Sequence, residues 1–166
     1  YAAAEGLSPG ITLSGKVKSY NPKNKLSITL KNADGNTINA TTISDSTETS
    51  GLTTQDFTFT GVVSGTYDLV VQKDGHLDYT IKTVVVGEED INLTQMTGKA
   101  YQTITMLAGD IEKNGWIDFA DYQELLRANN YGKATSESGV NVNADIDGND
   151  WVDFADYQIL LSNRHY

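Results

Sequence analysis

The chain has 166 residues, of which 39% are apolar and none is cysteine, and its net charge is −10. Without cysteine, disulfide bonds, thiolate zinc sites and cysteine nucleophiles are excluded. The acidic charge repels phosphate backbones, so no nucleic acid partner is expected, and no apolar run approaches the roughly 20 residues of a membrane span, so no membrane insertion is expected.

The N-terminal part has the pattern of β-strands. Its segments are rich in Val, Ile, Thr, Phe and Tyr, and many alternate apolar with polar residues, which is the period of a half-buried strand. Turn signals such as Asp-Gly separate them. About seven short strands predict an antiparallel β-sandwich in residues 1–98. The clearest segments are 11–18, 25–31, 36–43, 56–62, 66–72 and 78–86.

The stretch Thr60–Val86 contains a G-x-Y-x-L-x-V strand that leads through a glycine turn into the next strand. It resembles the carboxypeptidase-regulatory or prealbumin-like sandwich family. The resemblance implies an Ig-like or prealbumin-like fold, and such sandwiches are commonly spacers or supports.

Residues 96–110 show no convincing strand partner and are expected to form a junction. Beyond them the spacing becomes helical, and residues 99–166 are predicted to form a second, all-α module. These later residues also hold most of the charge, because residues 100–166 carry 11 acidic and four basic side chains. Such concentrated negative charge favours a bound cation.

An internal duplication lies in this second part. Residues 110–126, DIEKNGWIDFADYQELL, match residues 145–161, DIDGNDWVDFADYQILL, at 12 of 17 positions, and the copies start 35 residues apart. Each copy fits a 12-residue calcium loop, in which positions 1, 3, 5, 7, 9 and 12 supply oxygen ligands. The predicted ligands are Asp110, Glu112, Asn114, the Trp116 carbonyl, Asp118 and Asp121 in loop 1, and Asp145, Asp147, Asn149, the Trp151 carbonyl, Asp153 and Asp156 in loop 2.

Two calcium ions are therefore the expected cofactors. The alternative is a pair of acidic surface loops, but four carboxylates in one loop repel one another unless a cation is bound. Magnesium is disfavoured because it keeps several waters. Two departures stand out: Glu112 is longer than the usual Asp at position 3, and loop 2 has Asp150 at position 6, where the left-handed backbone favours glycine. Loop 2 is still predicted to bind calcium.

No amphipathic helix precedes either loop, and position 12 is Asp where EF-hands use Glu, so each unit is a loop followed by one helix. The duplicated D-x-[DEN]-x-N-x-x-x-D-x-x-D pattern in residues 109–166 resembles the dockerins. That resemblance implies a calcium-dependent, non-catalytic module that binds a cohesin and anchors a scaffoldin or enzyme in a cellulosome, the extracellular complex that degrades plant polysaccharides.

Both copies place Phe-Ala at positions 10 and 11, the principal recognition pair of dockerins, and this apolar pair looks like type II dockerins. Type II dockerins often follow a β-sandwich called the X module at the end of a scaffoldin. The chain therefore resembles an X module–dockerin tandem, 1–98 and 99–166. The implied partner is a type II-like cohesin of a scaffoldin or cell-surface anchoring protein, and the implied location is secreted or cell-surface-associated in an anaerobic cellulolytic bacterium.

Positions 10, 11, 14, 17 and 18 form one continuous helical stripe, which predicts the partner-binding surface. The alternative is that its Phe and Leu side chains complete the core or pack on the sandwich. Tyr122, Leu125, Tyr157 and Leu160 are assigned to the core instead. The predicted stripe comprises Phe119, Ala120, Gln123, Leu126 and Arg127, together with Phe154, Ala155, Gln158, Leu161 and Ser162.

Two other functions remain open: an EF-hand-like calcium sensor or buffer, and a carbohydrate-binding sandwich with a calcium-binding tail. No nucleophile–base motif, H-E-x-x-H, G-x-S-x-G or phosphate loop occurs, so no catalytic residue is predicted. The isolated His76 and His165 are expected at the surface. Trp116 and Trp151 are expected to pack on the sandwich or to contact the partner.

Overall fold

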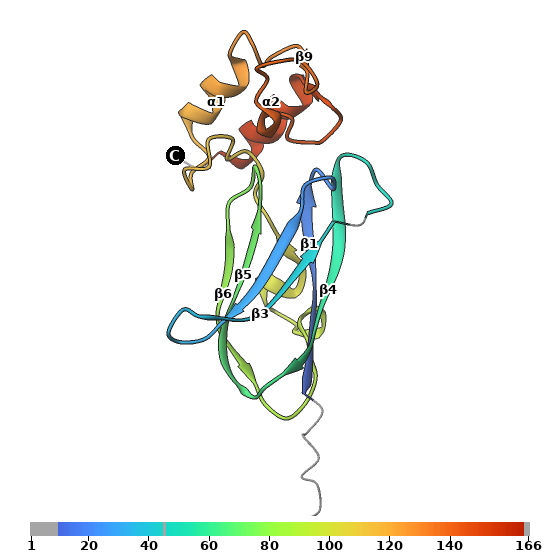
Figure 1. Ribbon diagram of the computed structural model, residues 1–166, viewed down its shortest axis with the longest axis vertical. Coiled ribbons are helices and arrows are strands. Elements are labelled where there is room, and N and C mark those ends of the chain that lie inside the picture. The colour runs from blue at the N-terminus through green and yellow to red at the C-terminus, as the bar shows by residue number, and fades with distance from the viewer. Residues whose placement is uncertain (1–9, 45, 165–166) are drawn as a thin grey trace, which may run out of the picture.

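The computed structural model describes residues 10–44 and 46–164 (Figure 1). The first nine residues of the predicted sandwich and His165 lie outside this range. Six long strands account for the N-terminal part, and each overlaps one of the six predicted segments. They are β1 (Ile11–Tyr20), β2 (Leu26–Lys31), β3 (Thr37–Ile43), β4 (Leu52–Val62), β5 (Gly65–Lys73) and β6 (Tyr79–Val86).

Two sheets pack face to face. One has the antiparallel order β3-β2-β5-β6, and the other joins β4 to β1 in antiparallel fashion. The short strands β7 (Ile91–Asn92) and β8 (Ile104–Thr105) also pair with β1, but in parallel. The expectation of an antiparallel sandwich is therefore correct for the long strands and wrong for these two short ones.

Alternation of apolar and polar residues builds the sandwich core. In β1 and β2 every second residue is buried, so Leu13, Val17 and Ile28 face the other sheet. Two residues that follow position 99, Ile104 and Met106, belong to the same core. Residues 96–110 thus do have a strand partner, β1, and the expectation of a bare junction is wrong.

The edge strand β6 carries a bulge. Thr83 has a left-handed backbone (φ 61°), which is rare for a β-branched residue. Asp68 on β5 holds this conformation, because its carboxylate accepts hydrogen bonds from Thr83 N (3.1 Å) and Lys82 Nζ (2.8 Å). The Lys82 hydrogen bond is also the main reason why the pKa of Asp68 lies below its ordinary value.

Beyond two 3-10 turns, Leu93–Gln95 and Ala100–Thr103, lie the duplicated units. Helix α1 (Phe119–Leu126) follows loop 1, and helix α2 (Phe154–Asn163) follows loop 2. Between them, β9 (Lys133–Ala134) pairs antiparallel with β10 (Trp151–Val152), which lies inside loop 2, and a 3-10 turn spans Val142–Ala144. No helix among the described residues is long and apolar enough to span a membrane.

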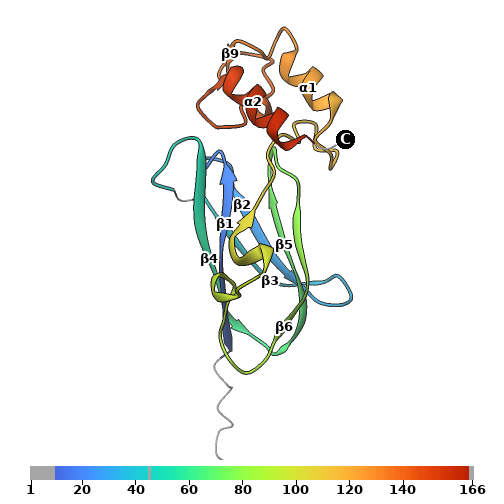
Figure 2. The ribbon, with the colours of Figure 1, turned by 180° about the vertical axis from the view of Figure 1, so that it is seen from behind.

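The predicted fold class, a β-sandwich followed by a separate all-α module, is wrong. The chain is one compact, mostly β unit, and its two helices are only eight and ten residues long. Two helices of this length bury too little apolar surface against each other to form a stable module by themselves. Leu125 and Leu160 share their core with Tyr20 and Leu77 of the sandwich. Figure 2 shows both helices at one end of the sandwich. The domain boundary expected between residues 98 and 99 stays a prediction.

Backbone hydrogen bonds fasten the helical end to the sandwich. The turn between β5 and β6 meets the segment before loop 1, where Gly109 N donates to Gly75 O (2.8 Å) and Leu77 N to Leu107 O (2.9 Å). On the other side, Gly51 N donates to Asp147 O (2.6 Å). Each loop is thereby placed against a different turn of the sandwich.

Candidate metal centre and binding surface

Loop 2 brings three predicted ligands together. Asp145, Asp147 and Asp156 each place one carboxylate oxygen within 4.8 Å of the others, and Asp145 and Asp156 are buried. Asp145 lies in the segment before the loop turn, whereas Asp156 lies in the first turn of α2. The fold therefore gathers acidic groups from two ends of the loop at one point.

Backbone amides explain why this loop closes. Asp156, which is fully buried, accepts hydrogen bonds from Ile146 N (2.7 Å), Asp147 N (3.0 Å) and Asp153 N (2.8 Å). Asp145 accepts from the amides of Gly148, Asn149 and Asp150. Asp153 caps α2 by accepting from Ala155 N (2.8 Å), and with Asp156 it forms a capping box.

Loop 1 repeats this network. Asp121 is fully buried and accepts from Ile111 N (2.7 Å), Glu112 N (3.1 Å) and Asp118 N (2.9 Å). Asp110 accepts from Asn114 N and Gly115 N, both at 3.0 Å. The loops differ at position 3: within the described residues the three-carboxylate group occurs in loop 2, while Glu112 of loop 1 is exposed.

Position 6 has the same backbone in both loops. Gly115 has φ 84° and Asp150 has φ 74°, so Asp150 adopts the left-handed conformation that the loop requires. Its carboxylate forms an ion pair with Lys23 on the turn after β1. Aspartate tolerates the left-handed region better than most residues, at a cost of about 1 kcal/mol.

The buried carboxylates are electrostatically strained. Desolvation raises the pKa of Asp156 to about 7, against the lowering effect of its backbone hydrogen bonds, and the charges of Asp147 and Asp145 raise it further. Desolvation likewise raises the pKa of Asp145 to about 6, and it raises that of Asp121. A nearby positive charge would relieve this strain in both loops.

The donor set fits a hard cation. Every predicted side-chain ligand is a carboxylate or an amide, and calcium takes six to eight such oxygens. Burial first and the neighbouring carboxylates second raise the pKa values of these groups, and a bound cation would offset both effects. The residues that would hold the ion in loop 2 are Asp145, Asp147, Asn149, Asp153 and Asp156, with the Trp151 carbonyl.

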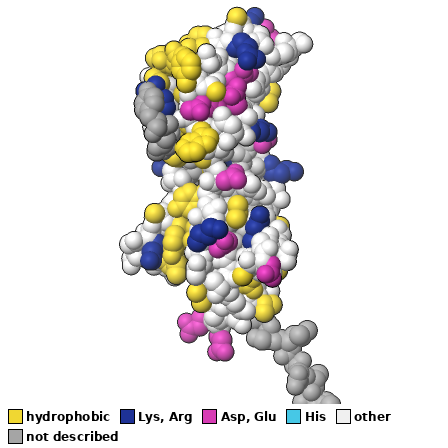
Figure 3. All heavy atoms as spheres, turned by 90° about the vertical axis from the view of Figure 1, so that its left-hand side faces the viewer, with side chains coloured by type: hydrophobic (Ala, Val, Ile, Leu, Met, Phe, Trp, Pro, Cys, Tyr) yellow, Lys and Arg dark blue, Asp and Glu magenta, His cyan; other side chains and the backbone are white. Residues whose placement is uncertain are grey.

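The predicted partner stripe lies on the surface. Phe119 and Phe154 are 66% and 58% exposed, and Leu126 and Leu161 are 37% exposed each. The alternative that these side chains complete the core does not hold. Gln123, Arg127, Gln158 and Ser162 are also exposed, while Ala120 and Ala155 are half-buried. Figure 3 shows hydrophobic side chains gathered at the helical end beside a group of acidic ones.

Four aromatic rings connect the two helices. Phe119 stacks on Tyr122 (5.7 Å between ring centroids), Tyr122 contacts Tyr157 (5.7 Å), and Tyr157 stacks on Phe154 (5.8 Å). Tyr122 and Tyr157 were assigned to the core, and they do pack against it, but both are half-buried and link the exposed phenylalanines. Both helices therefore contribute to a single aromatic surface.

Trp116 and Trp151 are 66% and 52% exposed. Each donates its backbone N–H to the side chain of the position-5 asparagine of its own loop, at 2.8 Å, which fixes the backbone at position 7.

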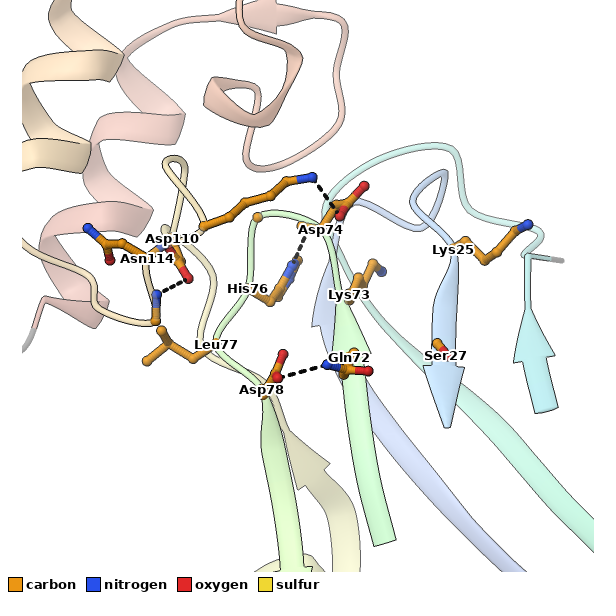
Figure 4. A pocket seen from close by; sticks show the side chains of 13 residues that line it. Lys25, Ser27, Gln72, Lys73, Asp74, His76, Leu77, Asp78, Asp110 and Asn114 are labelled. Atoms are coloured by element: carbon orange, nitrogen blue, oxygen red, sulfur yellow. Dashed lines mark hydrogen bonds and ion pairs between the residues drawn. The ribbon is translucent and has the colours of Figure 1, made fainter. Parts of the chain in front are cut away.

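A cleft of about 680 Å³ lies where loop 1 meets the sandwich. Asp110 and Asn114 line it from loop 1, and Lys73, His76 and Asp78 line it from the sandwich (Figure 4). His76 is 5% exposed, so the expectation of a surface histidine is wrong. Its Nε2 accepts from Tyr20 N (3.2 Å), and its Nδ1 lies 2.9 Å from Asp74 O, which makes it a structural link.

The comparisons with known proteins concern the fold. No protein-family model and no curated protein matches the chain. Two solved structures from Acetivibrio cellulolyticus are similar to it, both mutants of a type II cohesin–X–dockerin complex. The N-terminal interface mutant matches with a TM-score of 0.63 at 19% identity, over 95% of this chain and 97% of the other. The C-terminal interface mutant gives 0.61 and 18% over the same shares. The class of fold is thus that of a chain in a type II cohesin–X–dockerin complex.

Proposed function

We propose that the chain is the dockerin side of such a complex: a non-catalytic, calcium-dependent docking protein that binds a type II-like cohesin. The observation that carries the proposal is the duplicated loop–helix unit. Both copies share one hydrogen-bond network, and both lead into a helix that exposes the same Phe-Ala-Leu stripe. The whole-chain likeness to the Acetivibrio cellulolyticus structures supports it.

Calcium has a defined task in this proposal. When bound, it supplies positive charge to the loop carboxylates, and its binding energy then stabilises the folded loops. Because Asp118 and Asp153 are also the helix N-caps, each loop fixes the start of the helix that carries the stripe. The protein's own part is to hold α1 and α2 side by side, so that Phe119 and Phe154 meet the partner together.

The same proposal gives the chain a place outside the cell, at the bacterial surface or in a secreted cellulosome, where it links a scaffoldin or enzyme to its anchor. Extracellular calcium modules bind with dissociation constants of about 10⁻⁴–10⁻³ M, so millimolar calcium outside the cell would occupy such sites by half or more. A signalling sensor would instead need an opening movement of its helices.

The test is calorimetry against a panel of type I and type II cohesins, first in calcium and then in EDTA. We expect binding to a type II cohesin in calcium and its loss in EDTA. Binding that persists in EDTA would remove calcium from the mechanism, and failure with the whole panel would remove the cohesin. A glycan array run in parallel covers the carbohydrate-binding alternative.

A further inference from the structure

Asn21, at the end of β1, has its side chain buried against loop 2. It is 6% exposed and has a left-handed backbone (φ 54°). Its Nδ2 donates to the carbonyl of Asp145 (3.3 Å), which lies 124 residues later in the chain. Its Oδ1 is buried and has no hydrogen-bond partner among the described residues. The Asn21 side chain therefore occupies a buried space between the end of β1 and the backbone of loop 2.

Gly148, at position 4 of loop 2, shows how close the contact is. A Cβ atom built there would lie 2.5 Å from Asn21 Oδ1 and 3.1 Å from Asn21 Cα. The same position in loop 1 is Lys113, which also has a left-handed backbone (φ 58°) and carries a full side chain that reaches Asp74. Loop 2 needs glycine at this position because the sandwich occupies the space, whereas loop 1 does not.

The sandwich holds loop 2 through the backbone of its ligand residues. Asn21 bonds the carbonyl of Asp145, and Gly51 N bonds the carbonyl of Asp147. In loop 1 the contacts are different: Gly109, which precedes the loop, bonds Gly75, and the Lys113–Asp74 ion pair is exposed. Asp145 and Asp147 belong to the three-carboxylate group, so their placement decides whether those oxygens meet.

We propose that Asn21 is a positioning residue for the cation site of loop 2, so that the β-sandwich sets the affinity of that site and leaves loop 1 independent. The proposal rests on the calcium function above. Holding mutually repelling carboxylates in place before the ion arrives removes part of the ordering cost of binding, and groups that orient metal ligands from behind typically change affinity by about 10–100-fold. Loop 2 also needs support from the sandwich because the left-handed backbone of Asp150 opposes closure of the loop. Lys23, on the same turn as Asn21, forms an ion pair with the Asp150 carboxylate and restrains that residue.

The two tryptophans give each loop its own reporter. Trp116 belongs to loop 1 and Trp151 to loop 2, and the chain has two tryptophans in all. Terbium, which replaces calcium, luminesces when a nearby indole transfers energy to it. In a Trp116→Phe background the signal excited through tryptophan reports loop 2, and in a Trp151→Phe background it reports loop 1. Calcium competition then gives the affinity of each loop separately.

The decisive variant is Asn21→Gly, which keeps the left-handed backbone unstrained and removes the side chain. We expect the affinity of loop 2 to fall about tenfold or more and that of loop 1 to change less than about twofold. The matched control is Asn24→Gly on the same turn, whose side chain donates a hydrogen bond to Asp74 O of the turn between β5 and β6 (3.4 Å). The unchanged affinity of loop 1 shows that the variant is folded.

A double-mutant cycle tests the contact itself. Gly148→Ala alone should weaken loop 2 strongly, and in the Asn21→Gly background it should cost clearly less, because the two nearest atoms, Oδ1 and Cγ of Asn21, are gone while only Cα remains at 3.1 Å. Gly115→Ala in loop 1 controls for backbone strain alone, since it has a similar φ of 84° and open space around its Cβ position. Additive losses, or equal losses in both loops, would overturn the inference. Absence of terbium and calcium binding in the unmodified chain would instead overturn the proposed calcium function.

Discussion

Single residues show how much each loop depends on its last carboxylate. Asp121 and Asp156 are fully buried, close their loops through three backbone amides each, and belong to the capping boxes of α1 and α2. A residue with these tasks cannot move away when its charge is unfavourable. The strain stays in the site until a proton or a cation relieves it.

A pH dependence follows for the calcium-free chain. The pKa of Asp156, raised to about 7, means that the folded chain binds more protons than the unfolded one between pH 8 and 6.5. Lowering the pH over this window should therefore stabilise the calcium-free fold, by up to about 1 kcal/mol from Asp156, of which protonation of His76 in the unfolded chain removes roughly half near pH 6.5. The measurement is urea denaturation in EDTA at both pH values, followed by tryptophan fluorescence, so that the transition of the end of the molecule that holds the loops is read.

In calcium the direction should reverse, because protons compete with the ion. The window ends at pH 6.5 because His76 opposes the trend increasingly as the pH falls further. Burial lowers the pKa of His76 in the folded chain to about 4. At lower pH the unfolded chain therefore binds a proton at this histidine that the folded chain does not bind, which destabilises the fold. A calcium-free fold that loses stability between pH 8 and 6.5 would contradict the role given to Asp156.

The exposed phenylalanines carry the second prediction at this scale. Each can bury a side chain worth roughly 1.5–3 kcal/mol at an interface. Phe119→Ala combined with Phe154→Ala should weaken cohesin binding at least about tenfold and leave calcium affinity unchanged. Val142→Ala, an exposed apolar residue outside both helices (58%), is the control. Unchanged cohesin affinity in the double variant would remove these residues from the binding surface.

At the scale of elements, α1 and α2 differ although their sequences match. Glu124 of α1 is buried at its C-terminal end, where it pairs with Arg127 (2.7 Å) and accepts hydrogen bonds from Asn130 (3.1 Å) and Asn141 (3.2 Å). The corresponding residue of α2 is Ile159, which packs against the apolar core that contains Leu125 and Leu160. A buried polar cluster around Glu124, here called the polar anchor, therefore supports α1, whereas an apolar contact through Ile159 supports α2.

Asn130→Ala should release this anchor. Asn130 is fully buried, donates to Glu124 O (2.6 Å) and Glu124 Oε1 (3.1 Å), and accepts from Asn141 N (2.9 Å). Its loss leaves Asn141 N without this partner and removes two hydrogen bonds from Glu124, whose carbonyl keeps only the longer one from Arg127 N (3.3 Å). We expect a destabilisation of about 2–4 kcal/mol in calcium, since each buried group left unsatisfied costs about 1–3 kcal/mol. Chemical denaturation measures it. Asn129→Ala removes one exposed hydrogen bond and should cost under about 1 kcal/mol; equal losses in the two variants would refute the anchor.

The elements that could be predicted from the sequence are those with a repeating pattern. Alternation over six or more residues located β1 to β6, and the duplication located both loops and both helices. The strands β7 and β8 have two residues each, too few for any period, and Ile104 and Met106 enter the sandwich core only through their pairing with β1. The apolar faces of the two helices are evident in the sequence, which is why a separate all-α module was expected. Tyr20 and Leu77, which pack against the same core, are far from the helices along the chain, so the sequence did not reveal them.

In the candidate site, too, the features set by local sequence could be predicted and those set by long-range contacts could not. Its ligand positions are local and follow a spacing rule, so they could be proposed from the loops alone. Asn21, Gly51 and His76 could not, since they act through contacts with residues 32 to 124 positions away along the chain. An Asn-Pro turn and an isolated histidine look the same whether they face water or a neighbouring loop.

On the scale of the whole molecule, β1 connects the two ends. It pairs with β4, β7 and β8 and then ends in the turn that meets loop 2. Both tryptophans lie in the loops, so tryptophan fluorescence reports the helical end while far-ultraviolet circular dichroism is dominated by the sandwich. In calcium the two signals should change together during urea unfolding, because one end completes the core of the other.

Chelation should separate the two transitions. Without a cation the loop carboxylates repel one another, so the fluorescence change should move to lower urea while the sandwich, with its own core, unfolds later. Coincident transitions in EDTA would show that the loops hold their shape without the ion. Separate transitions in calcium would contradict the single compact unit.

The bulge at Thr83 affects the tendency of this chain to associate with other copies through the edge of its sheet. An open sheet edge offers free amides and carbonyls to any strand that comes near, and molecules with such edges tend to stick to each other. By kinking β6 in its middle, Asp68, Lys82 and Thr83 interrupt that row of groups. This edge of the sandwich is thereby less able to pair with a strand of a neighbouring copy.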